Sequence, residues 1–143
     1  MASPIELQMI LADYAAADGA TGKVHMMGAG WSVTGTPTGP QAVVLLLKIP
    51  WDRTNQPIPL RLRLIDTDGQ EVRLPTPDGE TPIEVRLQVE VGRPPGLPAG
   101  SMIDASTVVN IPPMPLRPGR YDWQLEVGNG EQTKVSGFTV RGS

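Results

Sequence analysis

The hexapeptide Leu116-Arg117-Pro118-Gly119-Arg120-Tyr121 constrains the fold of this chain more than any other segment. It leads directly into an alternating run of apolar residues, Tyr121, Trp123, Leu125 and Val127. A proline-glycine turn followed by such a tyrosine resembles the tyrosine corner of Greek-key β-sandwiches, in which the tyrosine hydroxyl bonds back to the preceding backbone. The segment therefore predicts a sandwich, with this run on one buried strand face.

The rest of the chain has the pattern of many short strands. Sixteen glycines and sixteen prolines are scattered along it, and these residues form turns and stop strands from pairing onward. Apolar and polar residues alternate in residues 5–11, 60–66 and 83–89, so each segment predicts a strand with one solvated face. Residues 41–49 are apolar at successive positions, which predicts a central strand covered on both faces, with Lys48 where it leaves the core.

Three further segments are assigned by their flanking residues. Residues 22–33 form the second predicted strand, although three glycines interrupt it, and residues 101–111 form another strand between proline-rich loops. Residues 11–20 contain an alanine run and are the one candidate for a helix. Gly19 and the strand-like start favour a loop there, so we expect no helix longer than a turn or two.

Two dipeptides predict hairpin turns. Asp68-Gly69 would join residues 60–66 to residues 70–74 in an antiparallel pair. The aspartates of this turn are predicted to bond their own backbone.

The second turn is Asn129-Gly130, which would join residues 121–127 to residues 131–140. Gly137 interrupts the last of these strands. We expect a bulge there that returns Phe138 and Val140 to the core face.

These patterns together predict one domain over residues 1–143. The fold class is all-β, an immunoglobulin-like or related Greek-key β-sandwich of eight or nine antiparallel strands. A chain of 143 residues is long enough to bury one substantial core.

Composition excludes several classes of partner. Twelve Lys and Arg against fifteen Asp and Glu give a net charge of −3 without a basic stripe, so we expect no nucleic-acid binding. The chain has no cysteine, which removes disulfides and thiolate metal sites. No signal peptide or membrane-spanning segment is seen, and the expected location is the cytoplasm or a virion.

No motif predicts catalysis, a cofactor or a metal. His25 is the only histidine and lies in an alternating segment without a nucleophile nearby. The sequence Asp66-Thr67-Asp68-Gly69 begins like a calcium loop, but its glycine comes early and Pro77 stands where a bidentate glutamate would be needed. Gly28-Ala29-Gly30 lacks the third glycine and the helix of a dinucleotide loop. We therefore expect a protein that is not an enzyme.

Two surface segments could recognise a protein. Residues 112–117 have the spacing of a polyproline ligand, but a rigid crossing between sheets is the simpler interpretation of this segment. Residues 51–57 begin with Trp51 and Arg53, the residue types that carry binding energy at interfaces. The alternative for this loop is a tryptophan folded over the end of the sandwich, with Asp52 and Arg53 paired beneath it.

Counting strand crossings gives a candidate site. If successive strands run antiparallel and each crosses once, the connections at residues 15–22, 50–57, 75–81 and 112–119 share one end, and Arg93 lies at the other. That end would collect an aromatic anchor and polar donors. These predicted partner-binding residues are Trp51, Arg53, Asn55 and Arg117.

Several segments of the chain together resemble a known family. They are residues 11–14, Gly22-Lys23-Val24-His25-Met26-Met27-Gly28, residues 91–98 and Pro118-Gly119-Arg120-Tyr121. They resemble an uncharacterised family of small actinobacterial β-sandwich proteins of unknown function, with phages as a second source. The resemblance implies no activity, cofactor or catalytic residue.

The sequence thus favours a non-catalytic protein-binding or assembly module whose partner is a protein. A homo-oligomer or a larger assembly is compatible with it. Two alternatives stay open, a structural or decoration component of a phage capsid or tail, and a carbohydrate-binding β-sandwich. The second would need more aromatic residues than the six that the chain contains.

Overall fold

The computed structural model describes residues 3–142, and this part of the chain is all-β. It contains twelve strands and one 3₁₀ turn, Trp51–Arg53. Seven strands are six to nine residues long: β1 (Glu6–Ala12), β5 (Gln41–Ile49), β6 (Ile58–Asp66), β9 (Glu84–Val89), β10 (Ile103–Ile111), β11 (Gly119–Val127) and β12 (Gln132–Val140). The others are shorter: β2 (Tyr14–Ala17), β3 (Val24–Met27), β4 (Val33–Thr34), β7 (Arg73–Thr76) and β8 (Gly79–Pro82).

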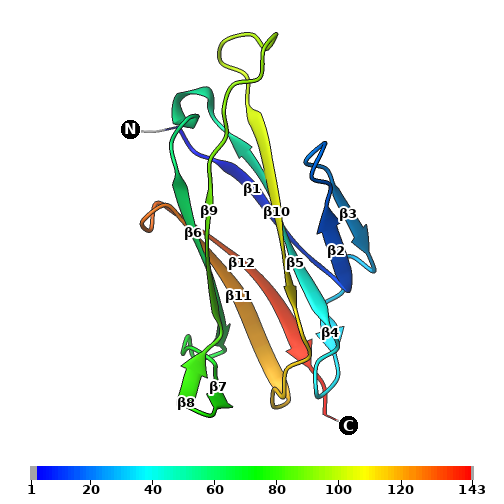
Figure 1. The fold of residues 1–143 in the computed structure, drawn as a ribbon. Helices are drawn as coiled ribbons and strands as arrows, with labels where there is room; N and C mark the ends of the chain where they lie inside the picture. The colour runs from blue at the N-terminus through cyan, green and yellow to red at the C-terminus, as the bar shows by residue number, and fades with distance from the viewer. Residues whose placement is uncertain (1–2, 143) are drawn as a thin grey trace.

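Two sheets pack on one another around a shared core (Figure 1). One is three-stranded, in the order β1-β5-β10, and the other is five-stranded, in the order β4-β12-β11-β6-β9. All pairs are antiparallel except β4 with β12, which are parallel. The predicted fold class, all-β with antiparallel sheets, is confirmed, and the short strands raise the count above the predicted eight or nine.

The core is built from alternate residues of both sheets, as a period of two requires. Trp123, Leu125 and Val127 of β11 are fully buried and Tyr121 is half-buried, so the predicted buried face is confirmed. The indole Nε1 of Trp123 donates to Oε1 of Gln41 across the core at 3.0 Å. This bond satisfies the one polar atom that so large a buried ring carries.

Strand β5 is covered on both faces, as its unbroken apolar run predicted. Its inner face contributes Val43, Leu45 and Leu47 to the main core. On its outer face Ala42 and Val44 are fully buried in a second apolar cluster with Ala12 and Ala15. Ala15 belongs to β2, so the hairpin of β2 and β3 covers this part of the three-stranded sheet.

The β2–β3 hairpin differs from the strand and loop predicted for this region. Residues 11–20 contain strand β2 instead of a loop, and the predicted strand over residues 22–33 is cut to β3 by a bend at Gly28 and Gly30. Both glycines have positive φ, and a Cβ on Gly28 would overlap the Asp13 carboxylate. The amide of Gly30 donates to the Leu11 carbonyl at 2.9 Å, which closes the base of the hairpin.

The predicted strand at residues 70–74 does not extend the β6 hairpin. The turn itself is confirmed, because Asp66 Oδ1 accepts hydrogen bonds from the amides of Asp68 and Gln70 at 2.9 and 3.0 Å. Beyond one bridge between Ile65 and Glu71, however, the chain leaves β6 and forms the separate β7–β8 hairpin. Strand β9 then takes the place beside β6.

The C-terminal elements follow their predictions closely. The hydroxyl of Tyr121 donates to the Arg117 carbonyl at 2.7 Å, which is the bond of a tyrosine corner. Strands β11 and β12 pair throughout, and the turn between them includes Asn129-Gly130. The bulge predicted at Gly137 is wrong, since Gly137 lies opposite Asp122 in a continuous register. A Cβ there would lie 2.7 Å from Oδ1 of Asp122, so a larger residue would require the Asp122 side chain to move.

The outer face of the five-stranded sheet carries a network of charges. Arg61 contacts Glu84, Glu71 and Glu126, while Arg63 contacts Glu71. The hydrogen bond from Arg61 lowers the pKa of Glu84 below its usual value, against the opposing effect of desolvation. These residues point outward as their alternation predicted, and they fix the solvated face of β6 and β9.

Candidate functional site

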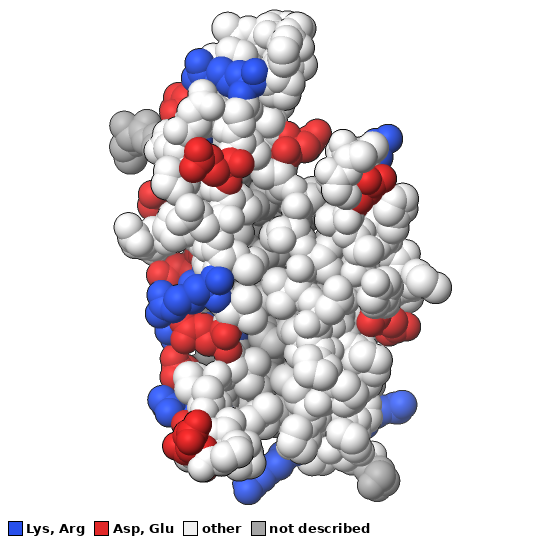
Figure 2. All heavy atoms as spheres, viewed as in Figure 1, with Lys and Arg blue, Asp and Glu red and all other residues white. Residues whose placement is uncertain are grey.

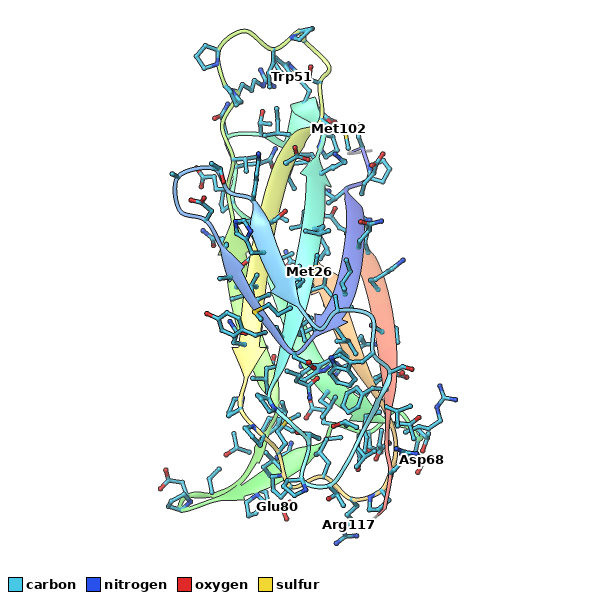
Figure 3. The ribbon with its side chains drawn as sticks, turned by 90° about the vertical axis from the view of Figure 1, so that its right-hand side faces the viewer. Met26, Trp51, Asp68, Glu80, Met102 and Arg117 are labelled. Carbon is cyan, nitrogen blue, oxygen red and sulfur yellow. The ribbon has the colours of Figure 1, made fainter. Side chains whose placement is uncertain are left out.

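Trp51 opens a single 3₁₀ turn that follows β5. Pro50 precedes it, the amide of Arg53 donates to the Pro50 carbonyl at 2.9 Å, and the Thr54 hydroxyl donates to the Trp51 carbonyl at 2.8 Å. The turn closes one end of the sandwich, and Trp51 lies at that end in Figure 3. Its side chain is half-buried.

Arg93 holds Trp51 in place. Its guanidinium carbon lies 4.4 Å from the centroid of the indole ring. The same group donates to the Trp51 carbonyl at 2.6 Å and to the Thr54 hydroxyl at 2.7 Å. Because the guanidinium stacks on the ring and also donates two hydrogen bonds, it covers one face of the indole and fixes the orientation of the Trp51 side chain. The prediction that Arg93 lies at the end opposite Trp51 is therefore wrong.

Arg53 is occupied within the fold. Its side chain is only 9% exposed and its Nη1 donates to Oε2 of Glu131 at 2.8 Å, with a second bond of 3.4 Å to the other carboxylate oxygen. This pair ties the 3₁₀ turn to the loop between β11 and β12. It replaces the predicted pairing of Arg53 with Asp52, whose carboxylate instead accepts hydrogen bonds from Ser3.

Asn55 stays at the same end, in the left-handed region with a φ of 61°. Its backbone amide donates to the Val91 carbonyl at 2.7 Å, and this bond links the turn to the loop that carries Arg93. Asparagine is among the few residues that adopt this conformation readily. The structure therefore assigns the Asn55 backbone to shaping the end of the sandwich.

Arg117 lies at the opposite end of the molecule from Trp51 (Figure 3). The predicted grouping of Arg117 with Trp51 is wrong because the count of crossings included residues 70–74 as a full strand. That segment does not cross the sandwich, so every later connection falls at the other end. The same error explains the misplaced Arg93.

An open cleft borders Trp51. It has a volume of about 440 Å³. Its lining residues are Ser3, Pro4, Glu6, Pro50, Trp51, Asp52, Gly100 and Met102. Met102 is 38% exposed and lies at the same end as Trp51 in Figure 3. We call the surface formed by Pro4, Trp51, Arg93 and Met102 the Trp51 end.

The cleft is negatively charged. Glu6 and Asp52 line it, and its lining within residues 3–142 includes no Lys, Arg or His. Desolvation works to raise the pKa of Asp52, but the hydrogen bonds from the Ser3 amide and hydroxyl outweigh it and lower the pKa. The carboxylate is thus kept ionised beside an apolar surface, an arrangement that suits a basic, partly apolar ligand.

Pro4 and Met102 were not identified from the sequence, and Arg93 was assigned to the wrong end. Pro4 precedes β1 and Met102 precedes β10, and both strands begin at the end where β5 finishes. A correct crossing count would have placed them together. The stacking of Arg93 on Trp51 has no local sequence signal, because the two residues are joined only by the tertiary fold.

The other motifs have structural roles or lie on open surface. His25 is exposed on β3, opposite Ala16. Residues 112–117 run between β10 and β11 and bury Met114 and Leu116, as a crossing segment would. Among the residues that the structure describes, no group of three or more His, Cys, Asp or Glu could hold a metal ion. Over the same residues, no helix is long and apolar enough to cross a membrane.

Comparison with known proteins places most of the chain in one family. A family model described as a family of unknown function (DUF6941) matches residues 7–141. No curated protein matches the chain.

Proposed function

The chain belongs to this family of unknown function, and we propose that it is a non-catalytic protein-binding or assembly module that docks a partner at the Trp51 end. The observation that carries the proposal is the fixed orientation of Trp51 beside an open cleft. Arg93 covers one face of the indole, while Pro4, Pro50 and Met102 line the cleft next to it. A large aromatic anchor that is already ordered loses little entropy on binding.

The chemistry of the cleft suggests what the partner presents. An apolar surface flanked by Glu6 and Asp52 complements an apolar side chain that is followed or preceded by Lys or Arg. Arg53 and Arg117 are excluded from the predicted donor role, since Arg53 is paired with Glu131 and Arg117 lies at the far end. Trp51 keeps its role as the anchor.

The proposal includes an immunoglobulin-like Greek-key architecture. The tyrosine-corner bond of Tyr121 supports it, and so does the order of the two sheets, in which sequential strands β5 and β6 belong to different sheets. Such folds present loops at the two ends of the sandwich and use them for recognition. The source that the sequence resemblance implies is an actinobacterium or a phage, so the partner would be a protein of that cell or of a capsid or tail.

The test compares two variants at opposite ends of the molecule. Immobilised wild-type protein, Trp51→Ala and the control Arg117→Glu are each exposed to a lysate of the source, and bound proteins are quantified by mass spectrometry. Trp51→Ala should lose the proteins that wild type captures, and Arg117→Glu should retain them.

A second variant separates binding from stability. Met102→Lys places a charge in the cleft and leaves both Trp51 and Arg93 unsubstituted, so capture should fall while the melting temperature stays near that of wild type. If both Trp51→Ala and Met102→Lys capture the same proteins as wild type, the Trp51 end is not the docking surface.

A further inference from the structure

No strand within residues 3–142 is hydrogen-bonded to the outer edge of β10. β10 pairs with β5 over its full nine residues, in an unbroken register from Ile103 opposite Ile49 to Ile111 opposite Gln41, and it ends the three-stranded sheet. Within residues 3–142 no backbone hydrogen bond joins its other side to another segment. A long, regular edge of this kind is a template for a further strand.

On the opposite side of the sandwich, formed by β1 and β12, the strand edges are protected by side chains. β12 pairs with β4 only at Thr139 and Val140, so the rest of its outer side is open. There Lys134 lies opposite buried Leu125, on the core-facing side of the strand, and remains exposed. Just before β1, the side-chain amide of Gln132 accepts a hydrogen bond from the Ile5 backbone amide and donates one to the Ile5 carbonyl, each at 2.8 Å. Inward-directed charges and capped backbone groups are devices that prevent edge pairing.

Strand β10 has neither device. Its sequence from Ile103 to Ile111 contains no Pro, Gly, Lys or Arg, and its one charge, Asp104, is paired with Lys48 at 2.9 Å. The core-facing residues Ala105, Thr107 and Val109 are only half-buried, whereas their partners on β5 are fully buried. The edge is therefore apolar, rich in strand-forming residues and incompletely covered.

A groove runs along this edge between β10 and β9. Two adjoining hollows, of about 360 and 420 Å³, share Val91 and Asp104 as lining residues. The core-facing residues of β9, among them Leu87 and Val89, are also half-buried. In Figure 1 the two strands run next to each other on the side that faces the viewer, and the loop over residues 90–102 connects them at the end that carries Trp51.

The smaller hollow of the groove has an acidic rim. Glu90 and Asp104 line it together with the hairpin tip at Thr21 and Gly22, whereas Arg93 lines the larger hollow. Figure 2 shows the middle of this face, over β10 and β5, free of charged side chains, with acidic side chains above it. A segment with a basic residue near one end and uncharged residues after it would match this distribution.

We propose that an extended segment of a partner protein, apolar at alternate positions and carrying Lys or Arg at one end, adds to β10 as a fourth strand. Its backbone pairs with the β10 edge, its alternate apolar side chains enter the groove between β9 and β10, and its basic residue meets Glu90. Strand addition of this kind draws affinity from main-chain bonds and specificity from alternate side chains. The groove shares no lining residue with the Trp51 cleft, although Arg93, which stacks on Trp51, lines the larger hollow of the groove.

The probe is a fluorescein-labelled nonapeptide with lysine at each end and with valine and threonine alternating between them, matched to the nine residues of β10. Fluorescence anisotropy measures its binding to wild type, to Ala105→Lys and to the control Val135→Lys. Ala105→Lys gives β10 the inward charge that Lys134 gives β12, so affinity should fall at least tenfold. Val135→Lys places the same charge on the outer face of β12 and should leave affinity unchanged.

Two measurements keep the test decisive if Ala105→Lys folds poorly. Glu90→Lys changes an exposed residue and should weaken the lysine peptide severalfold, while a matched peptide with glutamate ends should bind wild type worse than the lysine peptide. Amide hydrogen exchange of wild type should show added protection in β10 and none in β12 when the peptide is bound.

Three results would overturn the proposal. One is equal binding of the lysine peptide to wild type, Ala105→Lys and Glu90→Lys. Another is protection that falls on residues 50–56, which would move the peptide to the Trp51 cleft. The third is self-association of wild type that Ala105→Lys abolishes while the peptide does not bind, which would make a second copy the occupant. Trp51→Ala should bind the peptide like wild type, so loss of partner capture in that variant tests the proposed function alone.

Discussion

The two sides of the sandwich, where the sheets end, differ in how far side chains protect the backbone of their outer strands. On the β1/β12 side the Gln132 side chain joins the strands through two bonds to Ile5, and Lys134 stands on the core-facing side of β12. On the β9/β10 side no hydrogen bond joins the two strands within residues 3–142, and the core-facing side chains are half-buried. The backbone is regular on both sides. The difference therefore depends on a few side chains, and substitutions can transfer it from one side to the other.

The largest change in stability is expected for Trp123, which lies in the core that the two sides share. Trp123 is fully buried in the middle of the five-stranded sheet and bonds Gln41 across the core. Trp123→Ala should lower the free energy of unfolding by about 3 to 5 kcal/mol, since it leaves a large cavity. Denaturant unfolding measures this, and the exposed Thr133→Ala on β12 serves as the control with an expected change within about 0.5 kcal/mol. A variant that melts within a few degrees of wild type would show that the shared core is not the main stabilising element.

The next effect distinguishes the two sides directly. Gln132→Ala removes both bonds to the Ile5 backbone and should cost about 1 to 2 kcal/mol, because a partly buried amide and carbonyl lose their partners. The matched control is Gln88→Ala, an exposed glutamine on β9 at the other side, with an expected cost near zero. Equal costs in denaturant unfolding would mean that the Gln132 bonds do not close the β1/β12 side.

Replacing Lys134, which protects the open edge of β12, should change self-association of the protein more than its stability. Lys134→Val leaves an apolar residue on the core-facing side of an edge strand and should alter the free energy of unfolding by less than about 1 kcal/mol. Sedimentation velocity at matched concentrations should give a higher average mass for the variant than for wild type. The outer-face control Thr133→Val should sediment like wild type, and identical behaviour of all three proteins would refute a protective role for Lys134.

The smallest effect concerns the charges beside β9. The hydrogen bond from Arg61 holds the pKa of Glu84 below the ordinary value of 4.5, so the stabilisation is complete above that pH and is lost as the pH falls through the folded pKa. Glu84→Gln should therefore melt a little lower than wild type at pH 7, and the difference should shrink as the pH is lowered from about 5 toward 3. A difference in melting temperature that stays constant over this range would show that the Glu84 charge is not involved.

How far the sequence predicted the fold depends on how local the determining interactions are. The tyrosine corner at Tyr121, the turn at Asn129-Gly130 and the buried face of β11 were all predicted correctly. Each is decided by neighbouring residues, through turn conformation and a period of two. The candidate site was predicted only in part. Trp51 and Asn55 do share one end, because they belong to one short turn, whereas Arg117 does not join them.

The sequence by itself determined the strand content, the core-facing residues of the long strands and the turn that holds Trp51. Only the tertiary structure decided which segment pairs with β6, because a short alternating stretch such as residues 70–74 can join a neighbouring strand or fold away into its own hairpin. That choice set the end at which Arg93 and Arg117 lie, and with it the composition of the candidate site. Strand β9 pairs with β6 from Ile58 to Arg63, whereas residues 70–74 meet β6 at one bridge, and no local pattern encodes such a competition between distant segments.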